Sequence, residues 1–488
     1  MDQASRPKGR HAPLRLNRRR FVMTAAAALA AGRLRAQAAA GPKQGGESVL
    51  VVGAGLAGLA AASRLRDGGA RVSVIEARGE PGGRVRTLRG HFDGGIYGEL
   101  GAARIAETHA YVLHWINDLS LDLTPFAPTA GSPILAANGS LARADDEAAR
   151  ERLAPGLHPD ERRLTPAGLL LKSIDGVPEE LANPELDLSD PRWREFDRVT
   201  WPDWLASRGA SKAAIQLMML GGDSRPFSAL FMLQQIMLHR QSRQYLKIAG
   251  GMDRLPRAMA ARLSPLIRYN CELVRLERSA TGIRAICKQG GRTDTIAADR
   301  AVIAIPFSAL RRVAVEPPFS EAKRRAIAEL SYHEATRFLL QTRTRFWEAA
   351  GLTGGARTDG PADIWDMSFG QRGTRGLLSS TTGNAEIEKK LAAMTEAARL
   401  AFGVDQMKAA FPETGQQVQK YFIQRWVEDP YAGGAFTVFK PNQMTQWGAS
   451  LGRAEGRVHF AGEHASPWTG WMEGALWSGE HAAAEILR

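Results

Sequence analysis

The hydrophobic pattern of residues 48 to 84 predicts a strand, a helix and a second strand in succession. An apolar run over residues 49 to 52 ends at a glycine-rich turn, and an alanine-rich segment follows until Gly68 and Gly69. A second apolar run then ends at Glu76. A helix between two strands of this length is typical of a βαβ unit in a parallel sheet. This part of the chain is therefore predicted to have an α/β fold.

The turn after the first strand has glycines in the G-x-G-x-x-G spacing of a dinucleotide site. Gly53 permits the tight turn, Gly55 lets the backbone approach a pyrophosphate, and Gly58 lets the helix pack on the strand. The helix N-terminus then faces the phosphates. Glu76 is placed to accept hydrogen bonds from ribose hydroxyls and would repel the extra phosphate of an NADP-type ligand. The residues that follow favour FAD: Arg78, Gly82, Gly83 and Arg84.

Beyond this unit the pattern changes twice. Residues 116–245 are expected to be mostly helical, with the polar stretch 144–160 on the surface, and apolar strands return over 283–288 and 295–305. We therefore predict an FAD-binding Rossmann-like domain built from discontinuous segments, and a substrate domain of mixed sheet and helices. The predicted segments are 45–115, 246–320 and 441–488 for FAD, 116–245 for a helical substrate segment, and 321–440 for a substrate-binding sheet.

The net charge of +13 is concentrated at the N-terminus. Residues 1 to 38 contribute +8 and leave +5 for the rest, so neither nucleic acid nor an anionic membrane surface is needed as a partner. Residues 1–40 have the layout of a signal peptide: Arg18-Arg19 fits a twin-arginine signal, and the apolar run after it is too short to span a bilayer. We expect a periplasmic or secreted protein. A disordered basic arm is the alternative.

The sequence contains two cysteines, Cys271 and Cys287. Two isolated thiols are expected rather than a disulfide, because two cysteines do not form a disulfide framework. No CxxC or HExxH pattern occurs, so we predict no metal site.

The chain resembles the FAD-dependent amine oxidase family, which includes monoamine, polyamine and L-amino-acid oxidases, over about residues 46 to 488. The most specific matches are residues 82–84, 250–256, 345–347, 456–464 and 470–475. In monoamine oxidases a cysteine links the flavin where this chain has Ala435, so the resemblance implies noncovalent FAD. The implied cofactor contacts are Gly53, Gly55, Gly58, Glu76, Arg78, Gly83, Arg84, Val274, Glu463 and Met472.

Arg104 determines the predicted substrate class. In the resembling family, L-amino-acid oxidases have an arginine here, whereas simple amine oxidases have an aromatic residue. A guanidinium can bind a carboxylate through two parallel charge-assisted hydrogen bonds, which would orient the α-carbon over the flavin. The alternative is a structural role, in which Arg104 pairs with a protein carboxylate such as Glu99 or Glu107.

Three further residues complete the predicted catalytic site. Phe436 and Trp471 fall where the resembling oxidases have the two aromatic walls of the substrate site, although both could belong to the core. Arg337 stands where many family members have a lysine. An arginine stays protonated and cannot act as a base, which favours hydride transfer from a neutral amine. Asp366 is expected on the surface, and His239 is expected to be satisfied or solvated rather than catalytic.

We therefore predict oxidative deamination of L-amino acids to 2-oxo acids, with release of ammonia and hydrogen peroxide. The partners are an amino acid and oxygen or another electron acceptor, and a homodimer is left open. A monoamine or polyamine oxidase, in which Arg104 is structural, is the nearest alternative. A flavin amine dehydrogenase with a non-oxygen acceptor and a flavin-holding protein without catalysis are the others.

Overall fold

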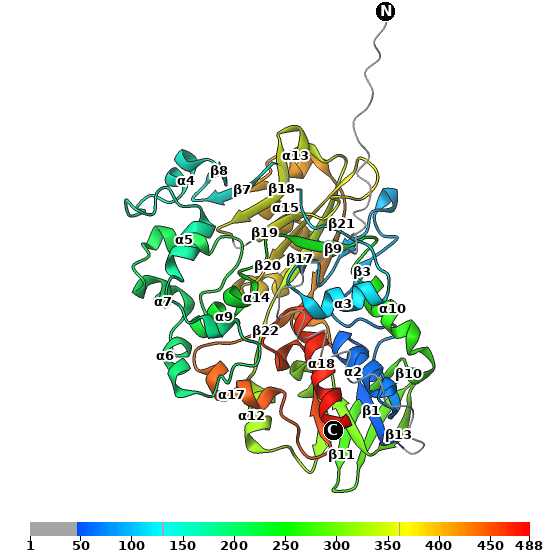
Figure 1. Ribbon diagram of the computed structural model, residues 1–488. Helices are drawn as coiled ribbons and strands as arrows, with labels where there is room; N and C mark the ends of the chain where they lie inside the picture. The colour runs from blue at the N-terminus through cyan, green and yellow to red at the C-terminus, as the bar shows by residue number, and fades with distance from the viewer. Residues whose placement is uncertain (1–45, 129–130, 361) are drawn as a thin grey trace, which may run out of the picture.

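The computed structural model describes residues 46–128, 131–360 and 362–488 (Figure 1). The predicted signal peptide, residues 1–40, lies outside the described residues. Among the residues that are described, no helix has the length and apolar character needed to cross a bilayer.

A parallel sheet in the lower half of the molecule forms the nucleotide-binding core (Figure 1). Its central strand β1 (Ser48–Val52) pairs with β2 (Arg71–Ile75) on one side and β14 (Arg300–Ile303) on the other. The edge strands are β10 (Ile267–Arg268) and β23 (Val458–Phe460). Residues 49 to 52 are almost completely buried, as expected for a strand covered on both faces. The α/β class and the Rossmann-like sheet are confirmed, with strands from distant parts of the chain.

Two helices begin beside the predicted cofactor site. α2 (Leu56–Asp67) follows the glycine-rich turn, and α18 (Met472–Leu487) packs against it (Figure 1). The approach is close, since a Cβ added at Gly479 would lie 2.1 Å from the carbonyl oxygen of Ala57. Packing between the two helix backbones therefore brings the C-terminal segment to the N-terminal motif.

A second, smaller sheet lies at the lower end of the molecule and contains both cysteines (Figure 1). It consists of β11 (Cys271–Arg278), β12 (Ile283–Gln289), β13 (Arg292–Ala298) and β15 (Ala314–Glu316). Cys271 and Cys287 are buried free thiols, so the expectation of no disulfide is confirmed. The single strand predicted over 295–305 is wrong. Asp299 separates β13 from β14, because its carboxylate accepts hydrogen bonds from Ser48 N and Oγ at 2.7 Å and anchors the chain beside β1.

The upper half of the molecule is a mixed sheet (Figure 1). Its order is β21 (Val418–Arg425), β17 (Thr336–Thr342), β20 (Gly376–Thr382), β19 (Ala362–Asp366), β18 (Leu352–Thr358), β7 (Ser132–Ala137) and β8 (Ser140–Arg143). A short separate sheet joins β5 (Ile105–Ala106), β9 (Tyr245–Ile248) and β6 (Leu123–Pro125). Strands β6, β7 and β8 fall in the segment expected to be mostly helical, so that expectation is corrected there.

The described residues from 147 to 239 contain several helices and no named strand, and they lie along one side of the molecule (Figure 1). The stretch 144–160 is not simply surface, because α4 (Glu147–Leu153) buries Leu153 completely. The helix that reaches the site is α9 (Ala229–His239), and Ser228 accepts a hydrogen bond from Phe231 N at its N-terminus. The other helices of this segment are α5 (Pro166–Ser173), α6 (Arg194–Asp197), α7 (Trp201–Ser207) and α8 (Lys212–Met218).

Candidate active site

A cavity of about 620 Å³ connects the nucleotide sheet to the upper sheet. Small-molecule and cofactor sites usually have volumes of about 300 to 1,000 Å³. The wall is built by α2, β2 and β11 at one end, and by α9, β17, β19 and β22 (Phe436–Val438) at the other. The start of α18 lies between them. One cavity therefore combines the dinucleotide motif with the predicted substrate residues.

The glycine-rich turn leaves room for a ligand at the first end. Gly53 has a φ of +104°, and a Cβ on Gly58 would lie 1.9 Å from the Gly53 carbonyl oxygen. By contrast, a Cβ on Gly55 would meet nothing within 4 Å, and one on Gly83 would meet only Gly55 Cα, at 3.7 Å. Gly55 and Gly83 thus line open space at the N-terminus of α2, where the backbone can approach a pyrophosphate.

Glu76 lies at the end of β2 and is buried. Its two carboxylate oxygens accept hydrogen bonds from Ala54 N at 2.7 Å and from Arg78 N at 2.8 Å. Burial raises the pKa of Glu76, against the lowering effect of these bonds. Each oxygen keeps a further lone pair, so the side chain can still accept hydrogen bonds from ribose hydroxyls.

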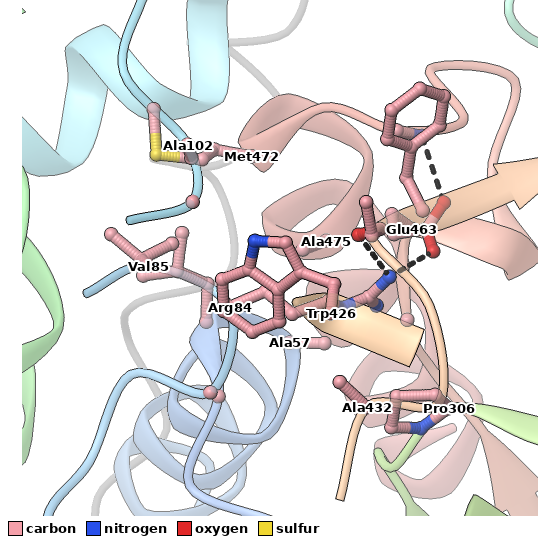
Figure 2. A pocket seen from close by; sticks show the side chains of 18 of the residues that line it. Ala57, Arg84, Val85, Ala102, Pro306, Trp426, Ala432, Glu463, Met472 and Ala475 are labelled. Atoms are coloured by element: carbon pink, nitrogen blue, oxygen red, sulfur yellow. Dashed lines mark hydrogen bonds and ion pairs between the residues drawn. The ribbon is translucent and has the colours of Figure 1, made fainter. Parts of the chain in front are cut away.

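Arg78 and Arg84, two of the predicted cofactor contacts, line the cavity and already have carboxylate partners. Arg78 pairs with Asp429, and Arg84 donates to Glu463 at 2.7 Å (Figure 2). Glu463 also accepts from Gly470 N at 2.8 Å. Although burial opposes it, the charge of Arg84 keeps the pKa of Glu463 below its usual value. Because these ion pairs are neutral overall, attraction for a pyrophosphate comes mainly from the N-terminus of α2.

The other predicted cofactor residues also line the cavity. Met472 is the first residue of α18, so the N-terminus of that helix lies at the cavity wall (Figure 2). Val274 lies at the irregularity where β11 and β12 lose their register, and it lines the cavity. Ala435 lines the wall next to Phe436 and has no thiol for a flavin link, so a noncovalent cofactor stays the prediction.

Arg104 lines the second end of the cavity and lies over three aromatic rings. Its guanidinium carbon is 5.1 Å from the ring centres of both Tyr245 and Trp365, and 5.6 Å from that of Trp471. Within the described residues it has no carboxylate partner. Glu99 accepts from Met252 N and Thr87, and Glu107 accepts from Arg243 N and Gln244, so neither of the two suggested acids pairs with it.

Arg337 is buried and forms hydrogen bonds to the loop that leads to Arg104. Its Nη1 donates to the carbonyl oxygens of Glu99 at 3.0 Å and Gly101 at 2.6 Å, and its Nε donates to Thr381 Oγ1 at 3.1 Å. Burial lowers the pKa of Arg337 to about 10, so the group stays protonated at neutral pH. It cannot serve as a base near pH 7.

Phe436 and Trp471 both line the cavity. Gly470, which directly precedes Trp471, lies against the Phe436 ring. A Cβ on Gly470 would lie 3.0 Å from the Phe436 ring, and the φ of +84° also favours glycine there. Neither aromatic is confined to the core, which was the alternative interpretation.

Many of the lining residues were not predicted from the sequence, and four of the larger side chains illustrate this. Trp426 donates through Nε1 to the Leu100 carbonyl oxygen at 2.9 Å and forms part of the wall (Figure 2). Trp365, Tyr245 and Met232 also line the cavity, and nothing in their local sequence distinguishes them from core residues.

The structure places His239 and Asp366, the two polar residues that were not expected to be catalytic. His239 has a hydrogen-bond partner at each ring nitrogen, as expected, and it also faces the cavity. Asp366 was expected on the surface, and that is wrong. It is 7% exposed, and it accepts hydrogen bonds from Ser368, which compensate for the burial of its carboxylate.

A dinucleotide site that opens into an aromatic and cationic pocket defines a flavin-dependent oxidoreductase. The family of flavin containing amine oxidoreductases matches residues 56–487, and the chain belongs to this family. FAD is therefore its cofactor, and the open cradle at Gly55 and the acceptors of Glu76 fit that group.

Three comparisons place the chain within the family. A Bacillus subtilis (strain 168) protein, provisionally assigned as an L-amino-acid oxidase, is 32% identical, and the alignment covers 90% of this chain and 94% of that protein. The L-amino-acid oxidase of Siganus canaliculatus is 30% identical, over 90% of this chain and 85% of its own. The solved cyclohexylamine oxidase from Brevibacterium oxydans IH-35A is 25% identical, with a TM-score of 0.75 over 91% of this chain and 99% of that one.

Proposed function

We propose that this protein oxidises L-amino acids. An amino acid, water and oxygen would give a 2-oxo acid, ammonia and hydrogen peroxide. Two relatives that share about 30% of their residues with the chain have names that refer to L-amino-acid oxidases, which supports this choice.

The proposal rests on the surroundings of the Arg104 guanidinium. Its guanidinium lines the cavity over three aromatic rings, without a carboxylate partner among the described residues. A planar guanidinium is matched to a carboxylate through two parallel hydrogen bonds. The α-carboxylate of an amino acid supplies the missing counter-charge, and a simple amine does not.

The residues around the substrate perform three tasks. Arg104 binds the carboxylate and so fixes the position of the α-carbon, while Phe436 and Trp471 restrict the approach of the amine. The charges of Arg104 and Arg337 lower the pKa of the substrate ammonium and favour its neutral form. No free base is required in the cavity, because the ammonium proton can leave to water.

FAD, when bound, supplies the two-electron acceptor for oxidation of the carbon–nitrogen bond. The N-terminus of α18 adds a partial positive charge at the cavity wall, beginning at Met472. That charge stabilises an electron-rich ring system.

An amine oxidase or an amine dehydrogenase is the second candidate function. Arg337, in place of the lysine typical of the resembling family, favours a change in reactivity toward oxygen and therefore another electron acceptor. A dehydrogenase would reduce a dye without releasing peroxide.

The test compares each amino acid with the amine formed by its decarboxylation. Anaerobic bleaching of the flavin reports turnover whatever the final oxidant is, and peroxide is measured in parallel. The wild type should reduce with the amino acid much faster than with the amine, and Arg104→Ala should abolish this preference. Arg243→Ala, a change at an exposed neighbouring arginine, is the control. A preference that survives Arg104→Ala would refute the proposal.

We also propose export through a twin-arginine signal in residues 1–40, supported by Arg18-Arg19 and the short apolar run that follows. Fractionation of cells that express the full chain, with Arg18→Lys/Arg19→Lys as comparison, tests it. Cytoplasmic retention of the wild-type chain would contradict the proposal.

A further inference from the structure

Two histidines face each other behind Trp471. His109 directly precedes α3 (Ala110–Asp118), His239 ends α9, and their Nε2 atoms are 3.0 Å apart. His109 is 1% exposed, whereas His239 lines the cavity. The chemistry described so far uses neither ring.

The outer hydrogen bonds assign the tautomer of each ring. Ala106 N–H donates to Nδ1 of His109 at 3.3 Å, so the proton of His109 lies on Nε2. Nδ1 of His239 donates to the carbonyl oxygen of Gln235 at 2.7 Å, so Nε2 of His239 accepts the bond from His109. All four ring nitrogens therefore have a partner, and both rings are neutral.

The pair contacts the Trp471 indole directly. The ring of His239 lies 4.5 Å from it at an angle of 34°, and the ring of His109 contacts it edge-on at 5.1 Å. Tyr245 is nearly parallel to the indole at 6.0 Å. Trp471 also precedes the first turn of α18, so its position is linked to that helix N-terminus.

We propose that His109 and His239 are positioning residues that fix the Trp471 indole as a neutral hydrogen-bonded pair, and that acid disables this arrangement. The inference rests on the proposed function, in which Trp471 is a wall of the substrate site. A proton added to either ring finds no free nitrogen and must break an existing hydrogen bond. For the same reason the pair is not the base that receives the substrate proton.

The charges around the pair act in the same direction. Arg104 faces His239, and burial together with this charge lowers the pKa of His239. Burial also lowers the pKa of His109. Three other titratable groups lie on the neighbouring elements. Tyr245 from β9 stacks on the same indole, Glu107 lies two residues before His109, and Glu473 from α18 accepts hydrogen bonds from the first turn of α3. Glu473 accepts from Tyr111 N and Val112 N at 2.9 Å, and burial raises its pKa to about 7.

The test measures the anaerobic rate of flavin reduction at saturating substrate between pH 5 and pH 8. The substrate is whichever amino acid or amine reduces the flavin fastest. The quantity is the ratio of the wild-type rate to the rate of His239→Gln, because titration of the substrate amine and of Glu473 affects both proteins and cancels. Misplacement of a reacting group by about 1 Å can cost about a hundredfold in rate. We expect a ratio of about ten or more at pH 8 that starts to fall toward one only below the ordinary histidine pKa of 6.5, because the pKa values of both rings are lowered.

A ratio that is the same at every pH would overturn the proposal, because a merely space-filling role does not depend on protonation. His109→Gln should reproduce the pH-dependent ratio, and His114→Gln, at an exposed histidine on α3, should give a ratio near one throughout. Loss of FAD from both pair variants would also overturn it, since the pair acts through Trp471 and leaves the dinucleotide end intact. If only amines reduce the flavin, the proposed function fails while the ratio still tests the pair.

Discussion

Replacement of Arg337 by methionine tests how the position of Arg104 is determined. Methionine has a similar length but no hydrogen-bond donor, so the carbonyl oxygens of Glu99 and Gly101 lose their partner. An unsatisfied buried acceptor costs about 1 to 3 kcal/mol. The bond to Glu99 is buried and the bond to Gly101 is part-buried, so their loss weakens the loop before Arg104 by at least about 1 to 3 kcal/mol.

Part of this cost should lower the free energy of unfolding of the protein, and part should let Arg104 move away from its position in the substrate site. We expect kcat/KM for an amino acid to fall about a hundredfold in Arg337→Met, corresponding to about 2.7 kcal/mol. The loss for the decarboxylated amine should be about tenfold or less, because that substrate does not use Arg104. Arg337→Lys keeps the charge and donors for both carbonyls, so its loss should stay within about tenfold.

The assay determines kcat/KM by peroxide release or flavin bleaching for both substrates in each variant. Arg343→Met is the matched control, since Arg343 lies just beyond the same strand and is exposed, and its side chain donates to the Gln416 carbonyl oxygen. Equal losses for the amino acid and the amine would show instead that Arg337 acts independently of Arg104.

Three further predictions concern the cofactor and stability. Glu76→Ala should weaken FAD binding about tenfold or more, measured by titration of the apoprotein, because it removes a charged acceptor; unchanged affinity would exclude a ribose contact. Gly55→Val should also weaken FAD binding and leave the melting temperature of the apoprotein unchanged, since its side chain enters open space. Burial lowers the pKa of His464 from 6.5 to about 4. The unfolded chain therefore binds a proton at this position before the native protein does, and the free energy of unfolding falls by roughly 3 kcal/mol between pH 6.5 and pH 4. His464→Phe should melt higher than the wild type at pH 5 but not at pH 8, and equal shifts at both pH values would contradict this.

The nucleotide-binding motif could be predicted because its signals are local. The roles of Gly53, Gly55 and Gly58 follow from backbone conformation within a single turn, and Glu76 follows from the end of the next strand. Trp365 and Trp426 could not be predicted in this way. They line a cavity whose other walls come from distant parts of the chain, which no local pattern records.

The missed hairpin of β7 and β8 had a usable signal. Asn138 and Gly139 both have positive φ, and an Asn-Gly pair after an apolar run is typical of a two-residue hairpin turn. The split of the strand predicted over 295–305 had a weaker one, the polar Asp299 within an apolar run. Its partner Ser48 is 251 positions away, so the reason for the break is visible only in the fold.

A crystal structure of the FAD-loaded protein with an α-methyl-L-amino acid, which has no α-hydrogen and cannot be oxidised, tests the role of Arg104. We predict that both carboxylate oxygens lie about 2.7 to 2.9 Å from nitrogens of the Arg104 guanidinium. A carboxylate bound elsewhere, or Arg104 paired with a protein acid in that complex, would contradict it.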